Sequence, residues 1–393
     1  MRKGWDYKKL GECFPYIKNG ANIKQIKDAK GYPITRIETL SGGLFNRDRM
    51  GYADIFDINR FQDYILEDGD LLMSHINSKA YIGRTVEYNS MNDEIIIHGM
   101  NLLRIKSNRN IILSPFFQFY TNSWHFKRNI ARIRKDAVNQ SSFAIADLKR
   151  IPIPVPPLAE QQSIVSELDK IHELISLKKA QLSDLDTLAQ SIFYEMFGDP
   201  IENEKGWEVK KLGEIAAEKL SYGSGASAIE YDGETRYVRI TDITDGGELD
   251  ANVVSPNAFD NKYLLNDGDI LFARSGATVG KTFLYKPKYG RCIYAGYLIR
   301  YVPDKKVVSP LYVFSFTKTN YYKSFISSSQ RTVAQPNINA KQYGDLLIPL
   351  PPLPLQQSFA RKIEAIEQQK TQIIATTKDL ETLLASRMQY WFD

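Results

Sequence analysis

The longest run of regularly spaced apolar residues extends from Ile153 to Phe197. After the proline-rich start IPVPPLAEQQ, apolar or long-stemmed side chains recur at alternating steps of four and three residues. This heptad spacing is typical of helices that pair along a seam, and the prolines suit an extended segment followed by a first helical turn. Gly198 and Pro200 end the pattern as helix terminators do. The stretch predicts a helix of about forty residues that is roughly 60 Å long.

A second copy of this pattern runs from Ile348 to Asp393 and begins with IPLPPLPLQQ. Its apolar positions follow those of the first copy at an offset of 195 residues. We expect the two helices to pair as a coiled coil, because one small domain does not cover so many heptads; a helix packed on a domain core is the alternative. The residues predicted to pair the helices are Ile164, Leu168, Ile171, Ile175, Leu182, Leu185, Phe359, Ile363, Ile366, Ile373, Leu380 and Leu384.

The segments that precede the two helices also repeat. Trp5 opens WDYKKLGE and Trp207 opens WEVKKLGE, while Tyr64 opens YILEDGDLLMS and Tyr263 opens YLLNDGDILFA. The short blocks RIETL and IGRT of the first half return as RITDI and VGKT in the second half. All blocks keep their order, and their offset falls only from 203 to 195 residues. The chain is therefore predicted to be a tandem duplication of a unit of about 195 residues.

Each copy combines short strand-like runs, such as 93–105 and 291–302, with a helix predicted at Ser114–Asn122 or Ser309–Tyr322. We expect an α+β fold of two mixed α/β domains, separated by two long antiparallel coiled-coil helices and related by approximate two-fold symmetry. Residues 198–206 would link the copies. The predicted domains are residues 1–150, a helix at 151–199, residues 200–345 and a helix at 346–393.

Composition places the chain among ordinary globular proteins, with 43% hydrophobic and 25% charged residues. The N-terminus has no apolar signal region and no window reaches membrane-spanning length, so we expect a cytoplasmic protein. Cys13 and Cys292 are far apart in the sequence and are expected to be reduced thiols.

The net charge of +5 is unevenly distributed. Residues 1–150 hold 24 Lys and Arg against 16 Asp and Glu, whereas residues 158–199 hold 3 against 8. A basic globular part fits a polyanionic partner such as DNA, with a solvated surface as the alternative.

The densest basic segment is KRNIARIRK, at Lys127–Lys135, and its counterpart in the second half is SSSQRTVAQPNINAKQ. Arg and Lys suit phosphates and guanine edges, while Asn and Gln can pair with adenine. Two matched loops, at 75–79 and 274–276, are further candidates. The predicted DNA-binding residues are Lys127, Arg128, Arg132, Arg134, Lys135, Gln140, His75, Asn77, Lys79, Arg84, Arg274, Ser275, Lys281, Arg331, Gln335 and Asn337.

The sequence contains no recognisable catalytic, cofactor-binding or metal-binding motif. SGATVGKT, at 275–282, resembles a phosphate-binding loop but lacks its first glycine, and the following TFLYKPKYG reads as a strand where that loop needs a helix. A glycine-permitted loop near a DNA backbone and a tight solvated turn both remain open. No methyl-donor loop, nuclease arrangement or metal-ligand spacing of the four histidines occurs. We predict no catalytic site, no cofactor and no metal.

The whole chain resembles the specificity subunits of type I restriction–modification enzymes. The resemblance is carried by the two helix starts at 151–162 and 347–357, the GD-[IL]-L motifs at 69–72 and 268–271, the repeated Trp-x-x-x-Lys-Leu-Gly-Glu starts and the 275–282 loop. It implies two target recognition domains that each read one part of a bipartite, asymmetric DNA target, with the paired helices as a spacer. It also implies docking to two modification (methyltransferase) subunits and, through them, to restriction subunits, and no chemistry by the chain itself. The alternatives are a fused catalytic methyltransferase or endonuclease, and a coiled-coil scaffold without a DNA role.

Overall fold

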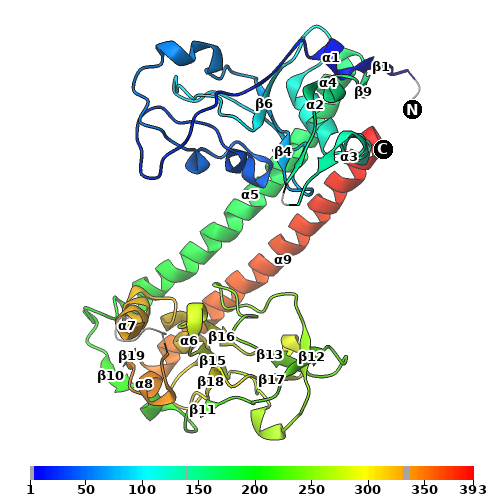
Figure 1. Cartoon of the computed structure of the whole chain (residues 1–393). Coiled ribbons are helices and arrows are strands. Elements are labelled where there is room, and N and C mark those ends of the chain that lie inside the picture. Colours follow the sequence, from blue (N-terminus) through cyan, green and yellow to red (C-terminus); the bar gives the residue numbers. More distant parts are fainter. Residues whose placement is uncertain (1–3, 139, 331–336) are drawn as a thin grey trace. The chain divides into compact units, whose positions relative to one another are not determined.

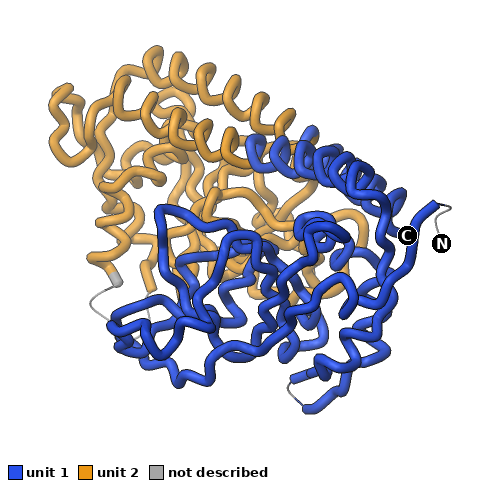
Figure 2. The backbone as a smooth tube through the Cα atoms, turned by 90° about the horizontal axis from the view of Figure 1, so that it is seen from above, with its two compact units in different colours: residues 1–178, 376–393 blue, residues 179–375 orange. Residues whose placement is uncertain are grey.

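The computed structural model describes residues 4–138, 140–330 and 337–393. The chain forms two compact units, which Figure 2 shows in different colours. Unit 1 comprises Met1–Lys178 and Thr376–Asp393, and unit 2 comprises Lys179–Ala375. Each unit therefore holds one globular part together with one half of each long helix. The predicted linker at 198–206 lies inside unit 2.

Unit 1 contains short strands and helices followed by the first half of a long helix. Its elements are β1 Asp6–Lys9, α1 Leu10–Cys13, β2 Tyr16–Asn19, three 3-10 helices (Ile37–Gly43, Arg47–Arg49, Asn59–Tyr64), β3 Leu71–Ser74, β4 Ile76–Asn77, β5 Thr85–Glu87, β6 Leu102–Lys106, α2 Ser114–Thr121, α3 Trp124–Ile133, β7 Lys135–Asp136, β8 Ser141–Ser142, α4 Ile145–Lys149, β9 Pro152–Val155 and the first half of α5 Leu158–Phe197, which continues into unit 2. The central sheet, of which Figure 1 labels β6, is antiparallel with strand order β2-β6-β3-β5. Two smaller sheets, β1-β9 and β4-β8-β7, complete this globular part.

Unit 2 repeats this plan. Its elements are β10 Glu208–Lys211, β11 Ser221–Tyr222, β12 Ala228–Glu230, β13 Arg236–Val238, β14 Val254–Pro256, β15 Ile270–Ala273, β16 Thr282–Leu284, β17 Cys292–Tyr294, β18 Leu298–Tyr301, α6 Pro310–Phe316, α7 Asn320–Gln330, α8 Ala340–Gly344, β19 Leu347–Leu350, α9 Leu353–Phe392 and four 3-10 helices (Leu212–Ile215, Asn261–Tyr263, Gly276–Thr278, Pro287–Tyr289). The sheet order β11-β18-β15-β16 and the pair β10-β19 match the central sheet and the pair β1-β9 of unit 1. The predicted duplication is confirmed in the fold.

The two long helices pack antiparallel within each unit. In unit 1, Arg387 near the end of α9 donates from Nη2 to Glu167 Oε2 near the start of α5 at 3.0 Å. In unit 2, Lys370 Nζ lies 2.9 Å from Asp186 Oδ1. The residues predicted to pair the helices are all buried or half-buried, and their role in the pairing stays a prediction: Ile164, Leu168, Ile171, Ile175, Leu182, Leu185, Phe359, Ile363, Ile366, Ile373, Leu380 and Leu384.

Aromatic side chains attach the helices to the globular cores. In unit 1, the Phe392 ring lies 5.5 Å from the Phe116 ring of α2, measured between centroids. In unit 2, Phe197 contacts Phe359 of α9 at 5.1 Å and Tyr312 of α6 at 4.8 Å. Burying such large apolar side chains is the main stabilising contribution at these contacts.

The first glutamine of the Pro-Pro-Leu-x-x-Gln-Gln motif joins the start of α5 to the segment before α2. Gln161 is fully buried, accepts a hydrogen bond from Leu113 N at 2.8 Å and donates to Ile111 O at 2.9 Å. It also donates to Pro156 O at 2.8 Å. The next residue, Gln162, is exposed. One amide thus satisfies three backbone groups that no helix or strand ladder satisfies.

The second motif repeats this connection in unit 2. Gln356 is fully buried, accepts from Ser309 N at 2.8 Å and donates to Pro351 O at 2.8 Å. Its neighbour Gln357 is exposed. The repeated Gln-Gln pair therefore contains one residue that fixes the helix and one that faces solvent.

The repeated Gly in IGRT and VGKT permits a close approach between a hairpin and a helix. Gly83 and Gly280 have φ values of +83° and +87°. A Cβ added at these positions would lie 3.1 Å from Ile130 Cγ1 of α3 and 2.8 Å from Ile326 Cγ1 of α7, respectively. Both the backbone conformation and the contact favour glycine.

Two secondary-structure predictions were wrong in part. The single helix predicted at Ser309–Tyr322 is two helices, α6 and α7, because the Thr317 and Thr319 hydroxyls bond carbonyls three residues back and close the helix end. The strand-like runs 93–105 and 291–302 each contain turns, so only Leu102–Lys106 of the first run is a strand and the second forms both β17 and β18. The helix predicted at Ser114–Asn122 is confirmed as α2.

Among the described residues, no helix has the length and apolar character needed to cross a membrane.

Candidate nucleic-acid interface

The small sheet β4-β8-β7 brings two predicted segments of unit 1 together. Asn77 pairs with Ser141, and Ser141 pairs in turn with Asp136. The loop after β3 therefore lies against the segment that follows α3, although about sixty residues separate them in the sequence. We call this part of the molecule, residues 75–79 with 134–142, the edge of unit 1; of residue 139 nothing is described.

Asp136 is the centre of a polar network on the edge of unit 1. Its carboxylate accepts from Ser141 Oγ at 2.6 Å and Arg134 Nε at 2.7 Å, and it lies 3.1 Å from Lys79 Nζ. The Ser141 hydroxyl, then Arg134 and Lys79, hold the Asp136 pKa well below its usual range. The network fixes two predicted DNA-binding cations in place. Lys135 and Gln140 on the same edge are exposed.

Helix α3 carries the remaining basic residues of the dense segment. Ser123 caps its start by accepting from Phe126 N at 3.2 Å, and Phe126 and Ile130 are buried. Lys127, Arg128 and Arg132 are exposed on the other side of the helix. Arg128 lies 4.9 Å from the ring centroid of Trp124, which is 55% exposed. This helix presents a basic surface with one aromatic ring.

Two of the predicted residues in unit 1 are held inward. His75 is buried 6.3 Å from the Phe143 ring, burial lowers its pKa, and its Nδ1 has no hydrogen-bond partner among the described residues. Arg84 donates to Leu40 O at 3.2 Å and stacks on Tyr81 at 4.6 Å.

Unit 2 builds an equivalent edge from different side chains. Ser275 forms an antiparallel bridge with Asn337, and Ile338 N donates to Arg274 O at 2.9 Å. The Arg274 guanidinium lies 4.9 Å from the Tyr222 ring and 5.8 Å from the Tyr297 ring. Arg274, Ser275 and Asn337 are thus brought together. The predicted residues Arg331 and Gln335 lie outside the described residues.

Lys281 points elsewhere. Its ammonium lies 2.8 Å from Asp245 Oδ1 and donates to Ile243 O at 3.2 Å. The segment after it is strand β16, as predicted, whereas a phosphate-binding loop continues into a helix.

Three exposed aromatic residues at these places were not predicted. Trp124, Tyr222 and Tyr297 are 55%, 43% and 58% exposed and each lies against an arginine. Of the three pairs, only Trp124 and Arg128 could have been found from the sequence, because they have the i, i+4 spacing of neighbours on a helix. The other pairs are too far apart in the sequence, by up to 52 residues for Tyr222 and Arg274.

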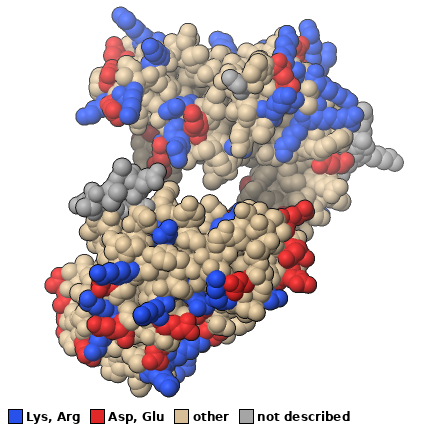
Figure 3. All heavy atoms as spheres, turned by 60° about the horizontal axis from the view of Figure 1, so that its bottom comes forward, with Lys and Arg blue, Asp and Glu red and all other residues tan. Residues whose placement is uncertain are grey.

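On the face shown in Figure 3, Lys and Arg form several clusters that Asp and Glu separate. The described residues contain no group of three or more His, Cys, Asp or Glu side chains placed to hold a metal ion.

A family model described as the type I restriction modification DNA specificity domain matches the chain twice, at residues 2–186 and 204–382. A putative type I restriction enzyme MjaX specificity subunit of Methanocaldococcus jannaschii is 32% identical, over 97% of this chain and 92% of that protein. The EcoKI specificity subunit of Escherichia coli K12 is 23% identical, over 90% of this chain and 81% of that protein.

The fold is similar to that of the S subunit of the M. genitalium type I restriction–modification system, with a TM-score of 0.59 and 14% identity over 99% of this chain and 96% of that chain. A structure described as showing complex assembly of the type I system gives a TM-score of 0.57, with 18% identity over 100% of this chain and 98% of that chain. The resemblance expected from the motifs is confirmed. This chain belongs to the family of DNA-specificity subunits of type I restriction–modification enzymes.

Proposed function

We propose that this chain selects the DNA target of a type I restriction–modification complex, and that each unit reads one part of a bipartite, asymmetric target. The observation that carries the proposal is the edge built twice on one scaffold. The bridge between Ser275 and Asn337 occupies the place that the pairing of Asn77 with Ser141 occupies in unit 1. Equivalent backbones with different side chains would read different bases.

Methylation mapping tests the choice of target. The chain is expressed with its methyltransferase in a host, and the methylated sequences are identified. We expect two short specific sequences separated by a non-specific gap of fixed length. Exchanging residues 1–150 with 200–345 should exchange the two sequences. A single continuous target, or an unchanged order after the exchange, would contradict the proposal.

Charge neutralisation tests helix α3. Arg132→Ala should weaken binding across all DNA sequences and lower the slope of log affinity against log salt by about 1, because each phosphate contact contributes about 0.9. Arg150→Ala is the matched control, since Arg150 is exposed and its one ion pair within the described part of the chain is with Asp147. Equal slopes for both variants would remove α3 from the interface.

We further propose that α5 and α9 set the gap between the two target sequences. Both helices are forty residues long and each is one continuous helix. A heptad added to each would lengthen them by about 10 Å, which corresponds to about three base pairs of DNA. Complexes with the longer helices should methylate targets with the longer gap, and retention of the original gap would refute the spacer role.

The proposed partners are two modification subunits and, through them, restriction subunits. The support is the family, together with exposed apolar residues on the long helices, such as Leu177 of α5 and Ile374 of α9, which are 59% and 57% exposed. Light scattering of the complex purified with the modification subunit should give two modification subunits per chain. Leu177→Glu should weaken that assembly and leave the folding of the chain unchanged.

We propose that the chain is not itself an enzyme. The support is that two matches to the specificity domain, at residues 2–186 and 204–382, take up most of this sequence. The purified chain should neither methylate nor cleave DNA, and turnover without partner subunits would contradict the proposal. No observation favours a scaffold without a DNA role.

A further inference from the structure

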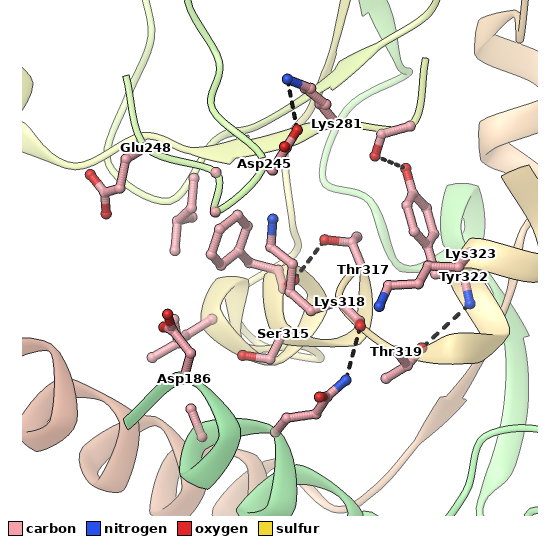
Figure 4. Close-up of a pocket in the computed structure, with 18 of the residues that line it drawn as sticks. Asp186, Asp245, Glu248, Lys281, Ser315, Thr317, Lys318, Thr319, Tyr322 and Lys323 are labelled. Atoms are coloured by element: carbon pink, nitrogen blue, oxygen red, sulfur yellow. Dashed lines mark hydrogen bonds and ion pairs between the residues drawn. The ribbon is translucent and has the colours of Figure 1, made fainter. Parts of the chain in front are cut away.

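A cavity of about 690 Å³ lies in unit 2, and all its lining residues belong to that unit. It is bounded by α6, α7, the hairpin β15–β16 and the parts of α5 and α9 that lie in unit 2 (Figure 4). Its volume falls in the range of about 300–1,000 Å³ that small-molecule sites occupy. Apolar side chains cover much of its wall, among them Val279, Leu284, Leu311, Phe314, Ile326 and Ile363.

Lys318 introduces an unpaired positive charge into this wall. It lies in the turn after α6, and its Nζ is 4.6 Å from the ring centroid of Phe314. Burial among these side chains lowers the pKa of Lys318 to about 8, against the opposing effect of Asp245 and Glu248. No carboxylate of the described residues forms an ion pair with it. A partly buried ammonium without a partner is unfavourable.

Lys281 and Lys370, which also line the cavity, differ from Lys318 because they have carboxylate partners. Lys281 is paired with Asp245 at 2.8 Å, and Lys370 is paired with Asp186 and Glu367, each at 2.9 Å. These pairs leave less charge to attract a ligand.

Lys323, like Lys286, adds a cation for which the described residues show no carboxylate partner. It is exposed in the first turn of α7, and the described carboxylates form no ion pair with it. Its charge is one of the causes that lower the pKa of Lys318. Figure 4 shows both lysine side chains extending from the α6–α7 region into the cavity. Two cations that repel each other at the rim of an apolar cavity would both be stabilised by an anion.

The duplication shows that the fold does not require this lysine. Tyr322 and Ile326 of α7 correspond to Phe126 and Ile130 of α3 at an offset of 196 residues, and both isoleucines face the equivalent glycines. At this offset the counterpart of Lys318 is Asn122. Asn122 is neutral and its amide donates to the backbone oxygen of Gln118 at 3.2 Å.

We propose that the cavity binds a small organic anion, with an apolar or aromatic body inside the cavity and a carboxylate, sulfonate or phosphate group on the ammonium groups of Lys318 and Lys323. The charged contacts would be strong, because the apolar wall keeps water from one side of them. This site is separate from the DNA edges, and its test does not depend on the chain's role in selecting DNA.

A pair of fluorescent probes tests both parts of the proposal. 8-Anilinonaphthalene-1-sulfonate carries an aromatic body and a sulfonate, and N-phenyl-1-naphthylamine is the same body without the charge. We expect the sulfonate probe to bind the full chain at one site, at least about tenfold more tightly than the neutral probe. Its binding should also weaken as the pH rises above about 8 and Lys318 loses its charge, while binding of the neutral probe stays constant.

Variants test whether the sulfonate probe binds in the cavity or on another apolar surface. Lys318→Asn, which introduces the residue of unit 1, and Lys323→Met should each weaken binding of the sulfonate probe about tenfold and leave binding of the neutral probe unchanged. Lys306→Met is the matched control, because Lys306 is an exposed lysine outside the cavity. Circular dichroism verifies that each variant is folded. If Lys318→Asn does not fold, Lys323→Met alone tests the proposal.

Three results would overturn the proposal. Equal affinity of the two probes would show that the cavity binds them through apolar contacts alone, without a contribution from the lysines. Equal effects of Lys306→Met and Lys323→Met would show that the probe responds to general surface charge. Displacement of the sulfonate probe by duplex DNA at a stoichiometry of one would identify the anion as a DNA phosphate instead of a small molecule.

Discussion

The buried glutamine at the start of α5 allows a quantitative test of how the helix is held. Replacing Gln161 by Ala removes the hydrogen bonds to Leu113 N, Ile111 O and Pro156 O, which measure 2.8–2.9 Å. The bond to Pro156 O is buried, and leaving that oxygen unpaired costs about 1–3 kcal/mol. The other two groups are only partly buried, so about 1 kcal/mol is expected for each. The free energy of unfolding of unit 1 should therefore fall by about 3–5 kcal/mol.

Differential scanning calorimetry measures this loss. For a unit of this size each kcal/mol shifts Tm by about 2–4 °C, so the transition of unit 1 should move down by roughly 6–20 °C. Gln162→Ala is the matched control, because the neighbouring side chain is exposed and makes none of these bonds. Hydrogen exchange gives a local readout: the Leu113 amide should lose protection in Gln161→Ala, while the Ser309 amide, which Gln356 holds in unit 2, should not.

If Gln161→Ala and Gln162→Ala gave the same Tm and the same exchange rate at Leu113, the proposed role of the buried amide would be wrong. A loss of stability in both variants would point to the helix itself, since both positions lie in its first turns. Only a loss confined to the first glutamine supports the hydrogen bonds as the cause.

Three further outcomes follow from the geometry. Gly280→Ala should destabilise unit 2 by about 1–2 kcal/mol in urea unfolding, because φ is +87° and the new Cβ would meet a side chain at 2.8 Å, whereas Gly225→Ala, with open space around it, should be nearly neutral. Phe359→Ala should cost about 3–5 kcal/mol, since the ring is fully buried against Phe193 and Phe197 of α5, while Ile374→Ala on the exposed face of the same helix should change little; thermal unfolding distinguishes them. Because the folded-state pKa of Lys318 lies below its value in the unfolded chain, the wild type should gain stability as the pH rises from about 8 to about 10, and Lys318→Met should lack this gain in Tm measured across that window. A wild type and a variant with parallel pH profiles would show that Lys318 is not desolvated.

The long helices could be predicted because their signal is local and regular. The heptad spacing of Ile164 and Leu168, continued over many turns, depends only on neighbouring residues and on the absence of a helix breaker. The break between α6 and α7 was missed, because the Thr317 and Thr319 hydroxyls can either extend a helix surface or close its end, and composition alone does not decide.

Only the part of the candidate interface with a high density of charged residues could be predicted from the sequence. Arg132 belongs to a visibly basic segment, and the structure exposes it. The network around Asp136 depends on pairing between segments about sixty residues apart, which no local pattern reveals. His75 was predicted to contact DNA, but it is buried. Lys281, equivalent to Arg84, forms an ion pair with Asp245, and the first half has no acidic residue at the position equivalent to Asp245.

The make-up of unit 1 from two distant stretches of chain has a consequence for its synthesis. The core of unit 1 includes Phe392, which packs on Phe116 and Tyr120, and Asp393 accepts from His125 N at 3.4 Å. All 197 residues of Lys179–Ala375 must be translated before this last stretch leaves the ribosome, a delay of roughly 10–40 s at 5–20 residues per second. Unit 2, in contrast, is one uninterrupted stretch. The first globular part to emerge is therefore the last to be completed, and a nascent chain that stalls before residue 376 would leave the Phe116 side of unit 1 open to chaperones and to association with other chains.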